Sequence, residues 1–144
     1  MREMSQDERR AFLTTPGRTG VLTTVRPDGR PHAAPIWFLL DVDDLVFTTW
    51  ETSVKARNLA RDPRAGLVVD DPAFPYAYVL VEGRCAVRDL RDDLAALRRW
   101  TTRIAARYVP ADQVDAYGSR NAVAGELLVR LQPEHLVAQT EIAG

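Results

Sequence analysis

The chain is poor in the residues that many small domains use for disulfides and metal sites. It contains one cysteine, Cys85, and two histidines, His32 and His135. A single cysteine excludes an internal disulfide and a cysteine-based zinc cluster, and it fits a reducing, cytoplasmic setting. Neither histidine has a cysteine or second histidine at metal-ligand spacing, so we expect no metal site. Because Cys85 falls inside an apolar strand pattern, we expect it to pack as a small hydrophobe and not to act as a nucleophile.

The chain also lacks a charge excess and any long hydrophobic run. Its 19 basic and 20 acidic residues leave a net charge of −1, which gives no support for nucleic-acid binding. No apolar run approaches the roughly 18 residues of a membrane-spanning helix, and the N-terminus is too polar for a secretory signal. A P-loop, an HExxH motif and a Ser-His-Asp order are missing as well. We therefore expect neither a membrane nor a nucleic acid as partner, and no dedicated catalytic residue.

The 144 residues suit one domain, residues 1–144, with a substantial core. Hydrophobic periodicity and turn residues predict short helices alternating with groups of strands. The predicted helices cover residues 6–13 and 53–61, a long one begins at Asp89 or Asp92 and ends near 108, and a helical turn at 112–117 precedes an irregular loop at 118–125. The predicted strands cover residues 19–25, 32–40, 45–49, 65–70, 76–88 and 126–131, the last extended by 135–139.

The connections between most predicted strands are short, which favours antiparallel pairing over βαβ crossovers. Six or seven antiparallel strands in one domain indicate a closed or nearly closed barrel, because closure removes exposed sheet edges. Gly83 lies within the longest predicted strand, where a glycine is typical of a bulge or bend. The sequence thus predicts a mainly β fold with flanking helices.

The segment from Thr48 to Leu59 carries the clearest functional signal. Lys55 and Arg57 fall in the first turns of the predicted helix, although cations there oppose the helix macrodipole. This placement makes sense if an anion binds beside the hydroxyls and free N–H groups at the start of the helix. The residues alone also allow a solvated basic helix capped by Ser53. Both interpretations stay open at this point.

Several motifs occur in a characteristic order along the chain: Gly20-Val-Leu-Thr-Thr-Val25, Asp28-Gly-Arg-Pro31, Pro35-Ile-Trp37, Ser53-x-Lys55-x-x-Asn58-Leu59, Asp62-Pro63-Arg64-Ala65 and Tyr78-Val-Leu-Val-Glu-Gly83. Together they resemble the pyridoxamine-5′-phosphate-oxidase-like flavin/deazaflavin split β-barrel family over about residues 12–136. Within that family the chain looks most like the short actinobacterial branch that uses the deazaflavin F420, whereas the broader family uses FMN. The resemblance implies a homodimer of six-stranded antiparallel Greek-key split β-barrels, with two cofactor sites at the dimer interface.

The resemblance also implies roles for particular residues. Ser53 and Lys55 would hold the cofactor phosphate with Asn58 nearby, and Thr48 and Thr49 would line the site. The strand residues His32, Ala33, Pro35 and Ile36 would run beside the ring of the cofactor. Tyr76 and Tyr78 would reach the site of the partner. The family often has an arginine at the strand position of His32 or Ala33, or just before Lys55, where this chain has Ser53. Phosphate binding would then rely on Lys55, Arg57 and backbone donors.

The resemblance implies an oxidoreductase that passes a hydride between F420 or FMN and a small conjugated substrate. Spare cations such as Arg57 and Arg61 would suit the acidic glutamate tail of F420, or they are solvated helix residues. A non-catalytic carrier or sensor needs the same phosphate cradle and stays an alternative. A third interpretation is a dimerisation module whose basic helix binds nothing. Trp37, Trp50 and Trp100 are expected to pack in the core or a dimer interface.

Overall fold

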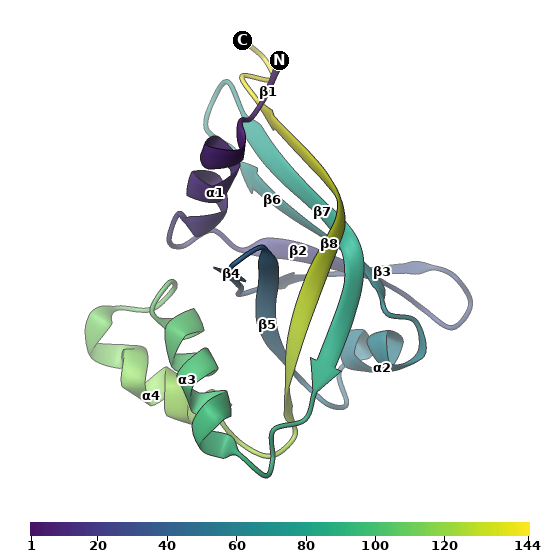
Figure 1. Cartoon of the computed structure of the whole chain (residues 1–144), viewed down its shortest axis with the longest axis vertical. Coiled ribbons are helices and arrows are strands. Elements are labelled where there is room, and N and C mark those ends of the chain that lie inside the picture. Colours follow the sequence, from purple (N-terminus) through teal and green to yellow (C-terminus); the bar gives the residue numbers. More distant parts are fainter.

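The structure, a computed structural model, describes all 144 residues as a strongly curved antiparallel β-sheet with four flanking α-helices (Figure 1). No helix is both long enough and apolar enough to pass through a bilayer. The helices are α1 (Gln6–Thr14), α2 (Val54–Arg61), α3 (Leu94–Ala105) and α4 (Val114–Asn121), with a 3-10 turn at Ala111–Gln113. The strands are β1 (Arg2–Glu3), β2 (Gly20–Val25), β3 (Pro31–Ile36), β4 (Leu39–Asp41), β5 (Asp44–Trp50), β6 (Arg64–Asp71), β7 (Ala77–Arg88) and β8 (Glu126–Thr140).

The eight strands form one sheet in the order β3-β2-β6-β7-β8-β5-β4, and β1 pairs with the end of β8. The predicted mainly β architecture with flanking helices is confirmed. The six-strand barrel is not, because the sheet has eight strands and its end strands β3 and β4 do not pair. Two changes account for the difference: the short β1 was not predicted, and the predicted strand 32–40 divides into β3 and β4.

The division between β3 and β4 has a cause far along the chain, at the C-terminal end of α3. The backbone N–H of Phe38 donates to Tyr108 Oη at 3.1 Å, and the Phe38 carbonyl accepts from Arg107 Nη1 at 2.8 Å. These side chains replace the ladder partners that a continuing strand would need. Phe38 itself is fully buried. The chain therefore bends at Trp37 and Phe38.

The outer edge of the sheet at β3 is protected by its own sequence. Pro31 and Pro35 have no N–H to donate, and prolines are tolerated in edge strands because no ladder hydrogen bond is lost there. Both prolines pair across to β2, opposite Val25 and Val21. An edge with few donors resists further strand addition.

The long strands β7 and β8 run side by side along the sheet and bend together (Figure 1). The pairing register shifts between Glu82 and Gly83, which confirms the predicted bulge. A Cβ at Gly83 would collide with the Gln132 carbonyl, so the close approach of the two strands requires glycine. The two predicted strand segments at 126–131 and 135–139 are one continuous strand, with Pro133 opposite the bulge.

The hydrophobic residues form two clusters, one inside the curve of the sheet and one outside it. The inner cluster includes Phe38, Phe47 and Val129, each fully buried. The outer cluster joins the sheet to α3 and includes Val46 and Leu97. The strand β5 contributes to both clusters because its successive side chains point to opposite faces of the sheet. This anchoring fixes the end of β5, from which the chain enters α2.

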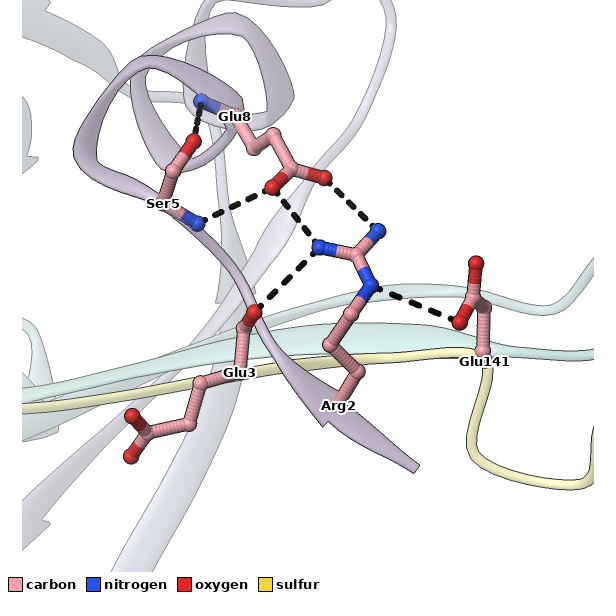
Figure 2. A network of polar contacts seen from close by, with 5 residues as sticks. All are labelled: Arg2, Glu3, Ser5, Glu8 and Glu141. Atoms are coloured by element: carbon pink, nitrogen blue, oxygen red, sulfur yellow. Dashed lines mark hydrogen bonds and ion pairs between the residues drawn. The ribbon is translucent and has the colours of Figure 1, made fainter.

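Polar contacts hold α1 at its N-terminal end (Figure 2). Ser5 and Glu8 form the predicted capping box: Glu8 N–H donates to Ser5 Oγ, and Ser5 N–H donates to the Glu8 carboxylate, each at 3.1 Å. Arg2 binds Glu8 through two hydrogen bonds of 2.8 and 3.0 Å and contacts Glu141 near the C-terminus. The Arg2 guanidinium lowers the pKa of Glu8 to about 2. The N-terminal strand, α1 and the C-terminal segment are thus linked at the surface.

The pair α3 and α4 follows β7 and covers the outer cluster. The predicted irregular loop at 118–125 is wrong in its first part, because α4 continues to Asn121. Gly118 explains the difference: it is buried against α3, and its carbonyl accepts a hydrogen bond from Thr101 Oγ1 at 2.7 Å. A Cβ at position 118 would collide with Thr102, so glycine here permits close helix packing.

Candidate functional site

The candidate site begins where β5 ends and the chain turns into α2. Thr49 is the next-to-last residue of β5 and is buried. Its hydroxyl lies 2.8 Å from Ser53 Oγ. Ser53 is the N-cap of α2 and accepts a hydrogen bond from Ala56 N–H at 3.1 Å. The two hydroxyls therefore join strand to helix and leave Ser53 limited capacity for a ligand.

The helix α2 presents different residues to different surroundings. Ala56, Asn58 and Leu59 are buried against the sheet, whereas Arg57 is exposed. Lys55 is half-buried, and its ammonium makes no hydrogen bond or ion pair within the chain. The two cations of the first turns thus point in different directions, and Lys55 alone faces a concave surface.

That surface is a pocket of about 220 Å³ between α2, the β3–β4 bend and the α3–α4 pair. Thr48 and Lys55 form its polar side together with Glu126, the first residue of β8. Trp37 stacks on Tyr108 with ring centroids 5.1 Å apart, which holds the indole in place beside the pocket. The lining residues are Pro35, Ile36, Trp37, Thr48, Lys55, Thr101, Ile104, Asn121 and Glu126.

The pocket contains opposite charges on Lys55 and Glu126. Partial burial raises the pKa of the Glu126 carboxyl, while the Thr48 hydroxyl and the Lys55 ammonium favour its charged form. A carboxylate in this position would repel a bound phosphate, whereas Lys55 would attract one. The net preference of the pocket for an anion therefore depends on the protonation of Glu126.

Four of the predicted site residues line this pocket: Thr48, Lys55, Pro35 and Ile36. Thr49 and Ser53 lie directly behind it as the strand–helix connection. Of the strand that the resemblance placed beside the ring, the end formed by Pro35 and Ile36 lines the pocket. Its role in ring binding stays a prediction.

Other predicted site residues lie away from the pocket. Asn58 is 2% exposed, and its amide donates to Thr24 Oγ1 at 3.0 Å and accepts from Arg61. These hydrogen bonds use the Asn58 side chain to join α2 to β2. His32 is half-buried near the start of β3, and its Nδ1 is buried with no hydrogen-bond partner in the chain. Arg57 does not line the pocket.

The two predicted tyrosines lie at the opposite end of the molecule from α2, around the β6–β7 connection (Figure 1). Tyr76 is 46% exposed, has a positive φ of 73° and contacts Phe74 edge to face at 5.8 Å. Tyr78 is half-buried in β7 opposite Asp70. Neither side chain reaches the Lys55 pocket of its own chain.

Five of the lining residues were not predicted as site residues: Trp37, Thr101, Ile104, Asn121 and Glu126. Trp37 was assigned to packing, and it does stack on Tyr108, but it also forms a pocket wall. Glu126 follows Gly125 and pairs with Trp50 across β5 and β8. Nothing local in the sequence marks it, because its place beside Lys55 arises from long-range strand pairing. No group of three or more potential metal-ligating side chains comes together.

The donor set fits the phosphate of a flavin-type cofactor. Lys55 supplies an uncommitted cation, Thr48 a hydroxyl, and the first turn of α2 has N–H groups without acceptors in the helix. The Pro35–Trp37 segment supplies a largely apolar wall of the kind that a planar ring requires. Burial raises the pKa of the Cys85 thiol to about 12, and the thiol lies in the inner cluster, so it offers no nucleophile to such a site.

Comparisons with known proteins place this geometry in a family. Among solved structures, a conserved hypothetical protein from Mycobacterium tuberculosis has a TM-score of 0.78 and 24% identity, over 96% of this chain and 86% of that one. An F420 reductase has a TM-score of 0.65 and 28% identity, over 88% and 94%. An FAD-binding protein from Mesorhizobium loti has a TM-score of 0.69 and 20% identity, over 95% and 93%. The family profile described as pyridoxamine 5'-phosphate oxidase matches residues 5–137, and the chain therefore belongs to this family.

Proposed function

We propose that the protein is an oxidoreductase that binds F420, or alternatively FMN, and transfers a hydride between this cofactor and a small conjugated substrate. The observation that carries the proposal is the uncommitted Lys55 ammonium in a pocket whose other wall is the Pro35–Trp37 segment. When bound, the cofactor supplies the hydride chemistry, and the protein supplies position and electrostatics.

The chain's own residues have separate tasks in this proposal. Lys55 and Thr48 bind the phosphate, and Ser53 and Thr49 fix the start of α2 so that its N–H groups face the anion. Pro35, Ile36 and Trp37 exclude water from one side of the ring. Asn58 acts at a distance by holding α2 on β2, because its side chain is already bonded there.

The charge around α2 favours F420 over FMN. F420 has an acidic glutamate tail, which requires cations beyond the phosphate ligand. Arg61 is committed to the Val25 carbonyl and Asn58, so it is a poor candidate for that tail. Arg57 is exposed and makes no side-chain hydrogen bond or ion pair, and it can accept the tail outside the pocket. The 28% identity to an F420 reductase supports the same choice.

We further propose that the working unit is a homodimer. A pocket of about 220 Å³ is smaller than the roughly 300–1,000 Å³ of a typical cofactor site, so one chain supplies only part of the enclosure. Apolar side chains near α2 are exposed and available to a second copy, among them Trp50 and Val54. The predicted contribution of Tyr76 and Tyr78 would then be made to the site of the partner, because they lie far from their own.

A non-catalytic F420 or FMN carrier or sensor is the alternative, because it would need the same phosphate site. The side chains that line the pocket include no standard pair of nucleophile and general base. Turnover therefore separates the two functions. Steady-state oxidation of reduced F420 or reduced FMN in the presence of a panel of conjugated acceptors supports the enzyme. Tight cofactor binding without turnover on any acceptor supports the carrier, and binding of neither cofactor contradicts both.

A further inference from the structure

A second cavity lies on the opposite side of the β4–β5 hairpin, beneath α1. It has a volume of about 450 Å³, which falls within the roughly 300–1,000 Å³ of small-molecule sites. Its lining shares no residue with the Lys55 pocket. The Lys55 site and the family resemblance do not account for it.

One side of the cavity is formed by residues of α1. Gln6, Arg9, Arg10 and Leu13 recur at the spacing of one helical face, and all four line the cavity. A helix that packs on a core normally has apolar residues on that face. Here Leu13 is buried together with the neighbouring Phe12, whereas Arg9 is half-buried and Gln6 and Arg10 are exposed. The helix therefore borders the cavity mainly with polar side chains.

The opposite side of the cavity combines an apolar floor with Asp43, Asp44 and Gln132. Leu45 of β5 and Val81 of β7 form part of it, and each is only 1% exposed. Leu136 of β8 also lines the cavity, although it is 42% exposed. An apolar floor beneath a polar wall fits a ligand that has a hydrocarbon part and one polar end.

Most charges around the cavity already have partners. Arg10 donates to the Val42 carbonyl at 2.7 Å and contacts Asp43 at 3.3 Å. Asp44 pairs with Arg130 at 3.2 Å. The exception is Arg9, which is half-buried and makes no side-chain hydrogen bond or ion pair. The uncommitted charge in the cavity is therefore one positive guanidinium.

The helix that forms this polar wall is held at both ends. At its start are the capping box and the Arg2–Glu8 pair (Figure 2). At its end, Arg107 donates to the carbonyls of Leu13 and Thr15, each at 3.1 Å. Both ends of α1 are thus held against the rest of the fold.

We propose that this cavity binds a small amphipathic monocarboxylate, with its carboxylate on Arg9 and its hydrocarbon part against Leu45 and Val81. Arg9 offers the planar, two-donor geometry that matches a carboxylate. The site is separate from the cofactor site, so a ligand there would bind with or without cofactor present.

Isothermal titration of octanoate into the full chain at neutral pH tests the proposal, with octylammonium as the ligand of opposite charge. We expect saturable binding of octanoate and no measurable binding of octylammonium. Arg9→Gln, which keeps a polar side chain but removes the charge and the guanidinium fork, is expected to weaken octanoate binding about tenfold or more. The matched control Arg99→Gln removes an exposed arginine of α3 and should leave the affinity unchanged.

Chemical-shift mapping of the backbone amides locates the ligand. Perturbations centred on α1 and the β4–β5 hairpin support the assignment. Perturbations centred on α2 overturn it, as does equal binding of both octyl ligands or an affinity unchanged in Arg9→Gln. Failure of F420 and FMN to bind leaves this proposal untouched, because the two sites share no residue.

Discussion

At the scale of single residues, the opposite charges of Lys55 and Glu126 in one pocket determine how the candidate site binds an anion. Both side chains are half-buried, and Glu126 has a raised pKa because burial disfavours its charge. A phosphate that binds to Lys55 must also tolerate this carboxyl. The charged form of Glu126 opposes phosphate binding, and the neutral form does not.

Glu126→Gln should therefore tighten binding of a phosphate-bearing cofactor at neutral pH by about two- to fivefold, the scale of a partly screened charge pair. In the wild type, affinity should rise as the pH falls through the raised pKa of Glu126, because protonation removes the repulsion. The variant should lack this part of the pH dependence. Fluorescence titrations of both proteins over a pH series measure the difference in cofactor affinity between them. The protonation of the cofactor itself affects both proteins equally and cancels from this difference. Weaker binding by the variant would assign Glu126 a ligand-binding role instead.

Asn58 illustrates a motif residue whose side chain is bound inside the fold. Its amide bonds Thr24 and Arg61, and the residue is 2% exposed. Asn58→Ala should lower the free energy of unfolding by about 1–3 kcal/mol, because it leaves buried polar groups without partners. Urea denaturation measures this loss. Arg57→Ala on the same helix is the control and should change stability by less than about 0.5 kcal/mol. An unchanged unfolding midpoint for Asn58→Ala would refute the structural role.

At the scale of elements, the C-terminal end of α3 joins three parts of the fold. Arg107 donates to the carbonyls of Phe38, Leu13 and Thr15, which belong to the β3–β4 bend and the end of α1. Its Nε is buried with no partner, and burial lowers the pKa of the guanidinium. The cation is held by backbone dipoles without a carboxylate.

Arg107→Met should therefore destabilise the protein by about 2–4 kcal/mol, since three carbonyls lose a charged donor while the apolar part of the side chain is kept. Thermal and urea unfolding both report the change. Arg103→Met, one helical turn earlier and exposed, is the matched comparison and should have a small effect. Equal stability of the two variants would show that Arg107 does not hold the bend.

The elements also show which features the sequence specifies locally. The Ser5–Glu8 capping box, the Ser53 cap and the Gly83 bulge depend on neighbouring residues and were predicted correctly. The bend at Phe38 was missed because its partners, Arg107 and Tyr108, lie about seventy residues away in the turn that follows α3. Glu126 was missed for the same reason: strand pairing, and no local motif, brings it to Lys55.

At the scale of the whole molecule, the proposed homodimer would complete the Lys55 pocket with a second copy and would bring the distant tyrosines to the partner's site. We expect light scattering after size-exclusion chromatography to give twice the 16.1 kDa mass of one chain. Trp50→Glu, which replaces an exposed apolar side chain near α2 with a charged one, should weaken both that dimer and the cofactor affinity. A wild-type monomer that binds the cofactor with full affinity would contradict the shared site.

The most direct test of the central claim is a parallel titration of F420 and FMN into the wild type, Lys55→Ala and Arg57→Ala. We expect micromolar or tighter binding of F420 to the wild type, and a loss of about tenfold or more in Lys55→Ala, because a charge-assisted contact to phosphate is removed. Arg57→Ala should weaken F420 more than FMN, since only F420 has an acidic tail. Absence of binding by both cofactors, or an affinity unchanged in Lys55→Ala, would contradict the account.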